Sequence, residues 1–181
     1  MSDVTPTIGA PQDEFTLSTR PEKSLGELIE EAGFDDVHFF IAEAVAEGAI
    51  DVPAADGDVT FALIPYEHAS RAIDDQTFAL VEEAGYEQAT LRDLLNLAIE
   101  RPNLQREYEV VALATLRTRR VFKDRPGETV WDQSELDRSI CQWATGLSNL
   151  KNKRTLIPVE LFLDKVLRKD TLLLVRPSTS D

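Results

Sequence analysis

Two glycines, Gly33 and Gly85, constrain the fold of this chain more than any other feature of its sequence. Each one follows an amphipathic pattern that is typical of a helix, and a glycine after such a pattern commonly ends it. The segments 28–34 and 80–86, which contain these glycines, match each other closely at an offset of 52 residues. Because repeat architectures usually need three or more units, we interpret the match as one helix ending used twice.

Helices dominate the elements that the first half of the chain predicts. Ser24 and Glu27 have the spacing of a capping box, which indicates a helix from Ser24 to Gly33. Apolar residues cover much of the circumference of the next helix, so we expect that helix to lie centrally. The elements predicted after Gly33 are a helix from Asp35 or Asp36 to about 47, a strand at 59–64, and helical regions at 66–84 and 90–101.

The second half of the chain predicts a mixture of strands and helices. Residues 107–122 fit either type, and we choose a strand because valine and threonine recur in them. The pair Pro126 and Gly127 then predicts a hairpin near 107–131. The later predictions are an amphipathic helix that starts at Ser134 and includes Leu147, a helix at 159–168, and a buried strand at 172–175.

These elements predict an α+β fold, a mainly helical single domain with a small, mostly antiparallel sheet that includes the hairpin near 107–131. The domain organisation follows from composition. Residues 1–23 are predicted to be a disordered tail, and 177–181 a second tail. Residues 24–176 form the globular domain, with an acidic helical part at 24–106 and a mildly basic part at 107–176.

Charge is distributed unevenly along the chain, whose formal net charge is -14. Residues 1–109 hold 24 Asp or Glu against 6 Lys or Arg, whereas 110–181 hold 9 against 13. An acidic surface repels nucleic acid and anionic membranes and attracts basic proteins. Our leading hypothesis is therefore a non-enzymatic protein-protein interaction module, such as an adaptor, inhibitor or assembly component, that binds a protein partner with a basic surface. The candidate partner-binding residues are Glu30, Glu31, Asp35, Asp36, Asp74, Asp75, Glu82 and Glu83.

A second hypothesis is a nucleic-acid-binding module. Residues 80–96 resemble a helix-turn-helix, and a basic hairpin after them would make the unit look like a winged helix. The resemblance implies that the second helix reads bases while the hairpin contacts phosphate. The candidate phosphate-binding residues are Arg117, Arg119, Arg120, Lys123, Arg125, Lys151, Lys153 and Arg154.

Catalysis and cofactor binding have little support in the sequence. Cys141 is the single cysteine, and neither His38 nor His68 has a local motif or a metal-ligand spacing. No phosphate-binding loop, dinucleotide turn or nucleophile elbow is present. We therefore expect no enzyme, no cofactor and no metal site. No apolar run approaches the ~20 residues that span a bilayer, so we expect a cytoplasmic protein that does not enter membranes; the sequence leaves the oligomeric state open.

Overall fold

The computed structural model describes residues 8–48, 50, 57–66, 73, 75–117, 142–160, 168 and 170–178. Within these residues the elements are, in chain order, β1 (Asp13–Ser18), α1 (Leu25–Ala32), β2 (Asp36–Val37), α2 (Phe39–Ala46), β3 (Asp58–Pro65), α3 (Asp75–Glu83), β4 (Tyr86–Gln88), α4 (Leu91–Glu100), α5 (Leu104–Glu107), β5 (Glu109–Arg117), β6 (Gln142–Leu150), β7 (Lys153–Glu160) and β8 (Thr171–Pro177).

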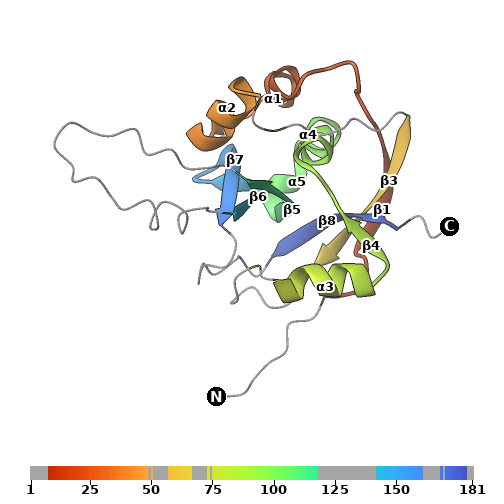
Figure 1. Cartoon of the computed structure of the whole chain (residues 1–181). Coiled ribbons are helices and arrows are strands. Elements are labelled where there is room, and N and C mark those ends of the chain that lie inside the picture. The colour runs from red at the N-terminus through yellow and green to blue at the C-terminus, as the bar shows by residue number, and fades with distance from the viewer. Residues whose placement is uncertain are drawn as a thin grey trace, which may run out of the picture.

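All eight strands belong to one sheet, which forms the middle of the molecule (Figure 1). Seven of them follow the order β1-β3-β8-β5-β6-β7-β2, and β4 pairs with β8 beside this path. The pairs β5–β8 and β2–β7 are parallel, whereas the other pairs are antiparallel. The expected mainly helical fold with a small sheet is therefore wrong: the protein is a mixed α/β structure with an eight-stranded sheet and five described helices.

The largest error concerns the helix expected from Ser134, because its described end, 142–147, belongs to β6. Trp143 and Leu147 are four residues apart, and residues at this spacing share a face in a strand as well as in a helix. The helix expected at 159–168 is also wrong at its start, since Val159 and Glu160 belong to β7. The strand expected around 107–122 is confirmed as β5, but it pairs with β6 and β8. The return strand expected at 129–131 lies outside the described residues.

Residues from both expected tails also belong to the sheet. β1 lies within the segment expected to be disordered, and six of its residues pair with β3, from Asp13 opposite Leu63 to Ser18 opposite Asp58. Pro177, assigned to the C-terminal tail, is the last residue of β8. The acidic and basic parts of the chain share this sheet, because β3 pairs with β8.

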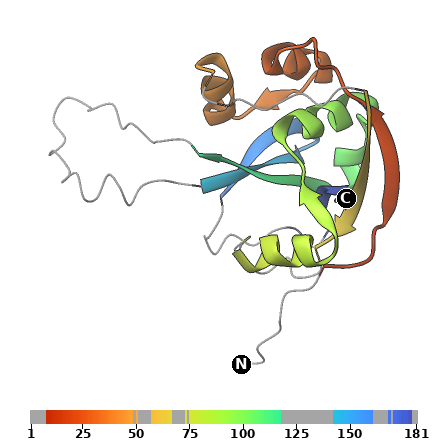
Figure 2. The same cartoon turned by 45° about the vertical axis from the view of Figure 1, so that its right-hand side comes forward.

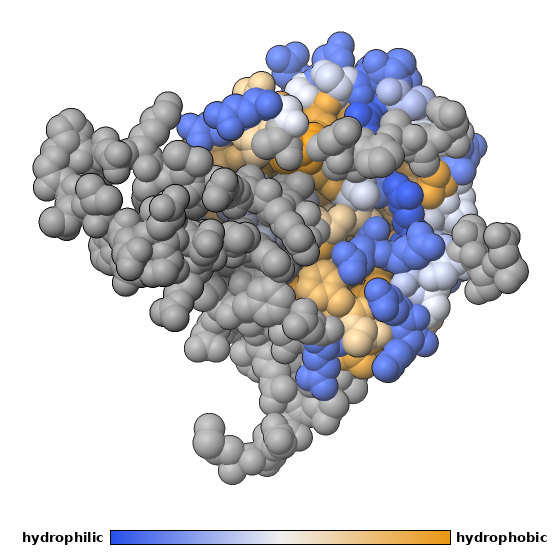
Figure 3. All heavy atoms as spheres, viewed as in Figure 1, coloured by the Kyte–Doolittle hydropathy of each residue, from blue (hydrophilic) through white to orange (hydrophobic). Residues whose placement is uncertain are grey.

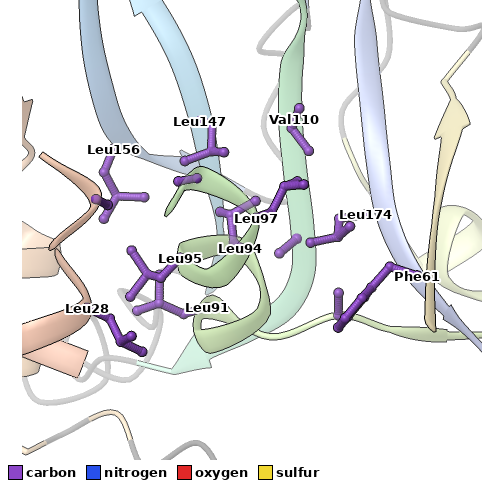
Figure 4. Close-up of a cluster of buried hydrophobic side chains, with 14 of the residues drawn as sticks. Leu28, Phe61, Leu91, Leu94, Leu95, Leu97, Val110, Leu147, Leu156 and Leu174 are labelled. Atoms are coloured by element: carbon purple, nitrogen blue, oxygen red, sulfur yellow. The ribbon is translucent and has the colours of Figure 1, made fainter. Parts of the chain in front are cut away.

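The hydrophobic core has two layers, one on each face of the sheet. The larger layer lies under α1, α2 and α4, and the smaller one includes Val81 of α3. Figure 2 shows α1 and α2 on one side of the sheet and α3 on the other. In the larger layer, Leu91 and Leu95 of α4 lie beside Leu28 of α1, and Leu94 and Leu97 lie toward the strands (Figure 4). The helix α4 is therefore packed between α1 and the sheet.

The helix pair at 80–96 does not form the expected helix-turn-helix. Strand β4 separates α3 from α4, and the two helices pack against opposite faces of the sheet. Most side chains of α4 are buried, so this helix has no free face to enter a groove. The two matching segments do share a local structure, since Gly33 and Gly85 both have positive φ, 62° and 81°, and each is followed by a short strand and a helix.

Candidate interaction surface

The helix α1 places its charged residues on the surface because its apolar residues occupy one stripe. Leu25, Leu28 and Ala32 are buried, whereas Glu30 and Glu31 are exposed. The Ser24 hydroxyl accepts a hydrogen bond from the Glu27 backbone N–H, and the Glu27 carboxylate accepts one from the Ser24 N–H. Sequence reasoning therefore located both ends of this helix correctly, from Ser24 to Gly33.

The helix α2 lies at the outside of the helical layer that covers one face of the sheet. The expectation from its composition, a central position, is therefore wrong. His38 is its N-cap, and its Nδ1 accepts a hydrogen bond from the Phe40 backbone N–H at 3.3 Å. Every residue of the helix except Glu43 is apolar. Ile41 and Ala44 are buried against the core. The apolar character therefore continues onto the outward side of the helix.

The outward side of α2 forms a stripe that we call the outer face of α2. Its residues are exposed and recur at helical spacing: Phe39, Ala42, Glu43, Ala46 and Glu47. At 100° per residue, Phe39 and the two alanines lie together, and the two glutamates lie along one flank. The outer face of α2 is thus an apolar strip with an acidic border.

Phe39 is the largest exposed group on this face. The residue is 58% exposed, and among the described residues the other exposed large hydrophobic residue is Leu150. The Phe39 ring lies 4.2 Å from the Phe40 ring and 4.7 Å from the His38 ring, measured between centroids. These contacts hold the ring at the start of α2 while the residue remains exposed to solvent.

Exposed acidic side chains lie on this helix and on the elements next to it. Glu30, Asp36, Glu43 and Glu47 are exposed and form no ion pair among the residues that the structure describes. Hydrophilic side chains gather over the top of the molecule, where α1 and α2 lie, with hydrophobic patches between them (Figure 3). We call Glu30, Asp36 and the outer face of α2 together the α1–α2 surface.

Two of the predicted partner-binding acids near α1 are used within the protein. Glu31 pairs with Lys23 at 2.6 Å and with Arg20 at 3.6 Å, and the hydrogen bond from Lys23 lowers the pKa of the Glu31 carboxyl. The carboxylate of Asp35 accepts a hydrogen bond from the Arg154 backbone N–H at 2.7 Å. These two side chains therefore have structural partners, whereas the side chains of Glu30 and Asp36 form no ion pair with any residue that the structure describes.

The remaining predicted acids lie elsewhere. Glu82 and Glu83 are exposed at the end of α3, on the opposite side of the sheet from α1 and α2. Asp75 is the first residue of α3, and Asp74 lies outside the described residues. The eight predicted residues therefore do not form one surface.

The predicted phosphate-binding residues that the structure describes do not gather in one place. Lys151 and Lys153 are exposed at the turn between β6 and β7, and Arg117 ends β5. The candidates between 118 and 141 lie outside the described residues, namely Arg119, Arg120, Lys123 and Arg125; Cys141 and His68 also lie outside them.

Arg154 points into the protein and connects two helices. Its Nη1 donates to the carbonyl oxygens of Ala32 at 2.8 Å and Gly33 at 3.2 Å, at the end of α1, and its Nη2 donates to the carbonyl of Ala98 in α4 at 3.1 Å. Burial lowers the pKa of the guanidinium. The carbonyl contacts offset this cost, because cations near a helix C-terminus are favourable. This guanidinium is committed to the fold.

Comparisons with protein-family models, with curated proteins and with solved structures each found no match for this chain. Within the described residues, no three His, Cys, Asp or Glu side chains are grouped so that they could hold a metal ion. None of the described helices is both long enough and apolar enough to span a membrane. The α1–α2 surface is therefore the feature of the described residues that best indicates a function.

Proposed function

We propose that this chain is a non-enzymatic protein-protein interaction module that binds a basic partner through the α1–α2 surface. The observation that carries the proposal is an exposed phenylalanine on the same layer of the fold as acids that form no ion pair with any described residue. We place this interaction in the cytoplasm, with no membrane involved, and both of these statements are predictions.

The two kinds of group on this surface support binding in different ways. Carboxylates without cation partners attract a basic protein over a distance of about 8 to 10 Å at physiological salt, which mainly raises the association rate. A large apolar side chain contributes binding energy because water is removed from its surface when the partner binds. Aromatic residues are enriched among the interface residues that dominate binding energy. Phe39 supplies such a contact within a border of Glu43 and Glu47.

The nucleic-acid hypothesis stays a prediction that no structural observation favours. Arg154 is bonded to three carbonyl oxygens of the protein, and α3 and α4 do not form the expected reading unit. Lys151 and Lys153 remain exposed, but two lysines at one turn are a small phosphate-binding surface.

A pull-down from the native host at low salt tests the proposal. The bait is compared with a variant in which Glu30, Glu43 and Glu47 are all replaced by Gln, and with a control in which Glu82 and Glu83 are replaced by Gln. We expect the first variant to lose the proteins that the wild type captures and the α3 control to keep them. Capture should also fall between about 50 and 200 mM salt, because screening shortens the range of the attraction.

Two outcomes would contradict the proposal. One is that the wild type captures no specific protein at low salt. The other is that the α1–α2 variant and the α3 control capture the same proteins as the wild type, since the unpaired acids of this surface would then have no role.

A further inference from the structure

The outer face of α2 also indicates what kind of segment the partner presents. A helix that is apolar nearly all round is normally buried on all sides. In α2, the inner residues Ile41 and Ala44 are buried, yet Phe39, Ala42 and Ala46 face outward. We propose, on the basis of the proposed function, that this face binds an amphipathic basic helix whose apolar stripe packs on Phe39 and the two alanines.

The shape of the strip fits a helix. Phe39, Ala42 and Ala46 have the spacing i, i+3 and i+7, which is the pattern that one helix presents to another. Alanine side chains are small and allow the backbone of a second helix to approach closely, while Phe39 projects at one end. The eight residues of α2 extend over about 12 Å, so the contact covers about two turns of the partner.

The charges decide which helix fits. Glu43 and Glu47 lie one turn apart along one flank of the strip, and neither forms an ion pair among the described residues. A partner with Lys or Arg one turn apart beside its apolar stripe matches both carboxylates. A second copy of this chain packed through the same face does not match, because it brings two more glutamates and no cation. An anionic membrane surface or nucleic acid is repelled for the same reason.

Synthetic peptides test this inference directly with the full-length protein. The first peptide is an amphipathic helix with Leu at i, i+3, i+4 and i+7 and Lys along the flanks. The second peptide has the same composition in a scrambled order without an apolar stripe. Binding is measured by fluorescence anisotropy of the labelled peptides at low and physiological salt. We expect the amphipathic peptide to bind at least about tenfold more tightly than the scrambled one. A difference of this size corresponds to the loss of one dominant interface contact.

Variants of the protein locate the binding site. Phe39→Ser should weaken binding of the amphipathic peptide by about tenfold or more. Ala42→Gln is a second variant that keeps a good helix former at an exposed position while blocking close approach, and it should weaken binding as well. The variant with Glu43→Lys and Glu47→Lys should abolish binding, whereas the α3 control with Glu82→Lys and Glu83→Lys should retain it. Thermal unfolding of each variant checks that the fold is intact.

The outcomes separate this inference from the proposed function. If the scrambled peptide binds as tightly as the amphipathic one, or if neither Phe39→Ser nor Ala42→Gln weakens binding, the inference of a helical apolar contact is wrong. The proposed function survives that result as long as the charge variant of α2 still loses binding. If the charge variant of α2 binds both peptides as well as the wild type at low salt, the proposed function and this inference both fail.

Discussion

Replacing Arg154 tests whether this residue serves the fold or a ligand. In Arg154→Met the side chain keeps most of its length, so the packing of its stem changes little, but three hydrogen bonds to Ala32, Gly33 and Ala98 are lost. Hydrogen bonds from a charged donor contribute about 1.5–3 kcal/mol each, and the relief of burying the charge offsets part of the loss. We expect the free energy of unfolding to fall by about 2–4 kcal/mol.

Thermal and urea unfolding monitored by circular dichroism would measure this change. For a chain of this size each kcal/mol lowers Tm by about 2–4 °C, so the expected decrease is about 4–16 °C. Arg154→Lys should lose part of the same free energy, because an ammonium cannot bridge both helix ends with a planar fork. The matched control is Lys153→Met at the exposed neighbouring position, where we expect a change within about 0.5 kcal/mol. Equal stability of Arg154→Met and the Lys153 control would refute the structural role.

Two further substitutions test other interactions in the same layer. Asp93→Asn removes the carboxylate charge that accepts a hydrogen bond from Arg176 at 2.5 Å. Because Asp93 is almost fully buried and Arg176 is 24% exposed, we expect the free energy of unfolding in urea to fall by about 3 kcal/mol, the lower end of the range for broken buried pairs. A decrease below about 1 kcal/mol would contradict this expectation. Hydrogen bonds from Ser24 lower the pKa of Glu27, so the stability from this carboxylate is present above its unfolded pKa and is lost as pH falls through its folded pKa. Ser24→Ala keeps the bond from the Ser24 backbone N–H, which is the larger cause, and removes the bond from the hydroxyl. It should therefore raise the Glu27 pKa only in part in an NMR titration, and loss of the N-cap should lower stability by about 1 kcal/mol. An unchanged Glu27 pKa would show that the Ser24 hydroxyl does not bond this carboxylate in solution.

Local signals in the sequence predicted local structure well. The capping box of Ser24 and the positive φ of Gly33 both depend on residues within one turn of the helix end. The choice of a strand around 107–122 was also right for β5, because β-branched residues favour a pleated and buried surface. Each of these predictions needed information from fewer than about ten neighbouring residues.

The sheet depends on contacts between distant segments, which the sequence patterns did not resolve. Trp143 and Leu147 fit a helix stripe, but the pairing of β6 with β5 and β7 places both residues on one face of a strand. β1 was missed for a different reason. Its alternation consists of Phe15 and Leu17 among polar residues, a signal too short to distinguish an edge strand from a tail.

The candidate surface was predicted in part. The exposed acids Glu30 and Asp36 could be named from composition, but Phe39 could not, because its helix is apolar on all sides and the pattern indicated a central position. The same pattern is expected for a surface helix whose outer side is covered by a partner. Composition alone cannot distinguish a central helix from a surface helix, whereas the exposure of Phe39 places α2 at the surface.

The uneven charge of the chain has both a structural and a surface component. Some basic groups of the C-terminal part are used to join it to the acidic part: Arg176 binds Asp93, and Arg154 binds the ends of α1 and α4. Within the acidic part, Arg20 and Lys23 are bound to Glu31. Because these cations are already committed, they cannot neutralise the outer face of α2. Among the residues that the structure describes, no cation pairs with the acids of that face, and under the proposed function a basic partner supplies the matching cations.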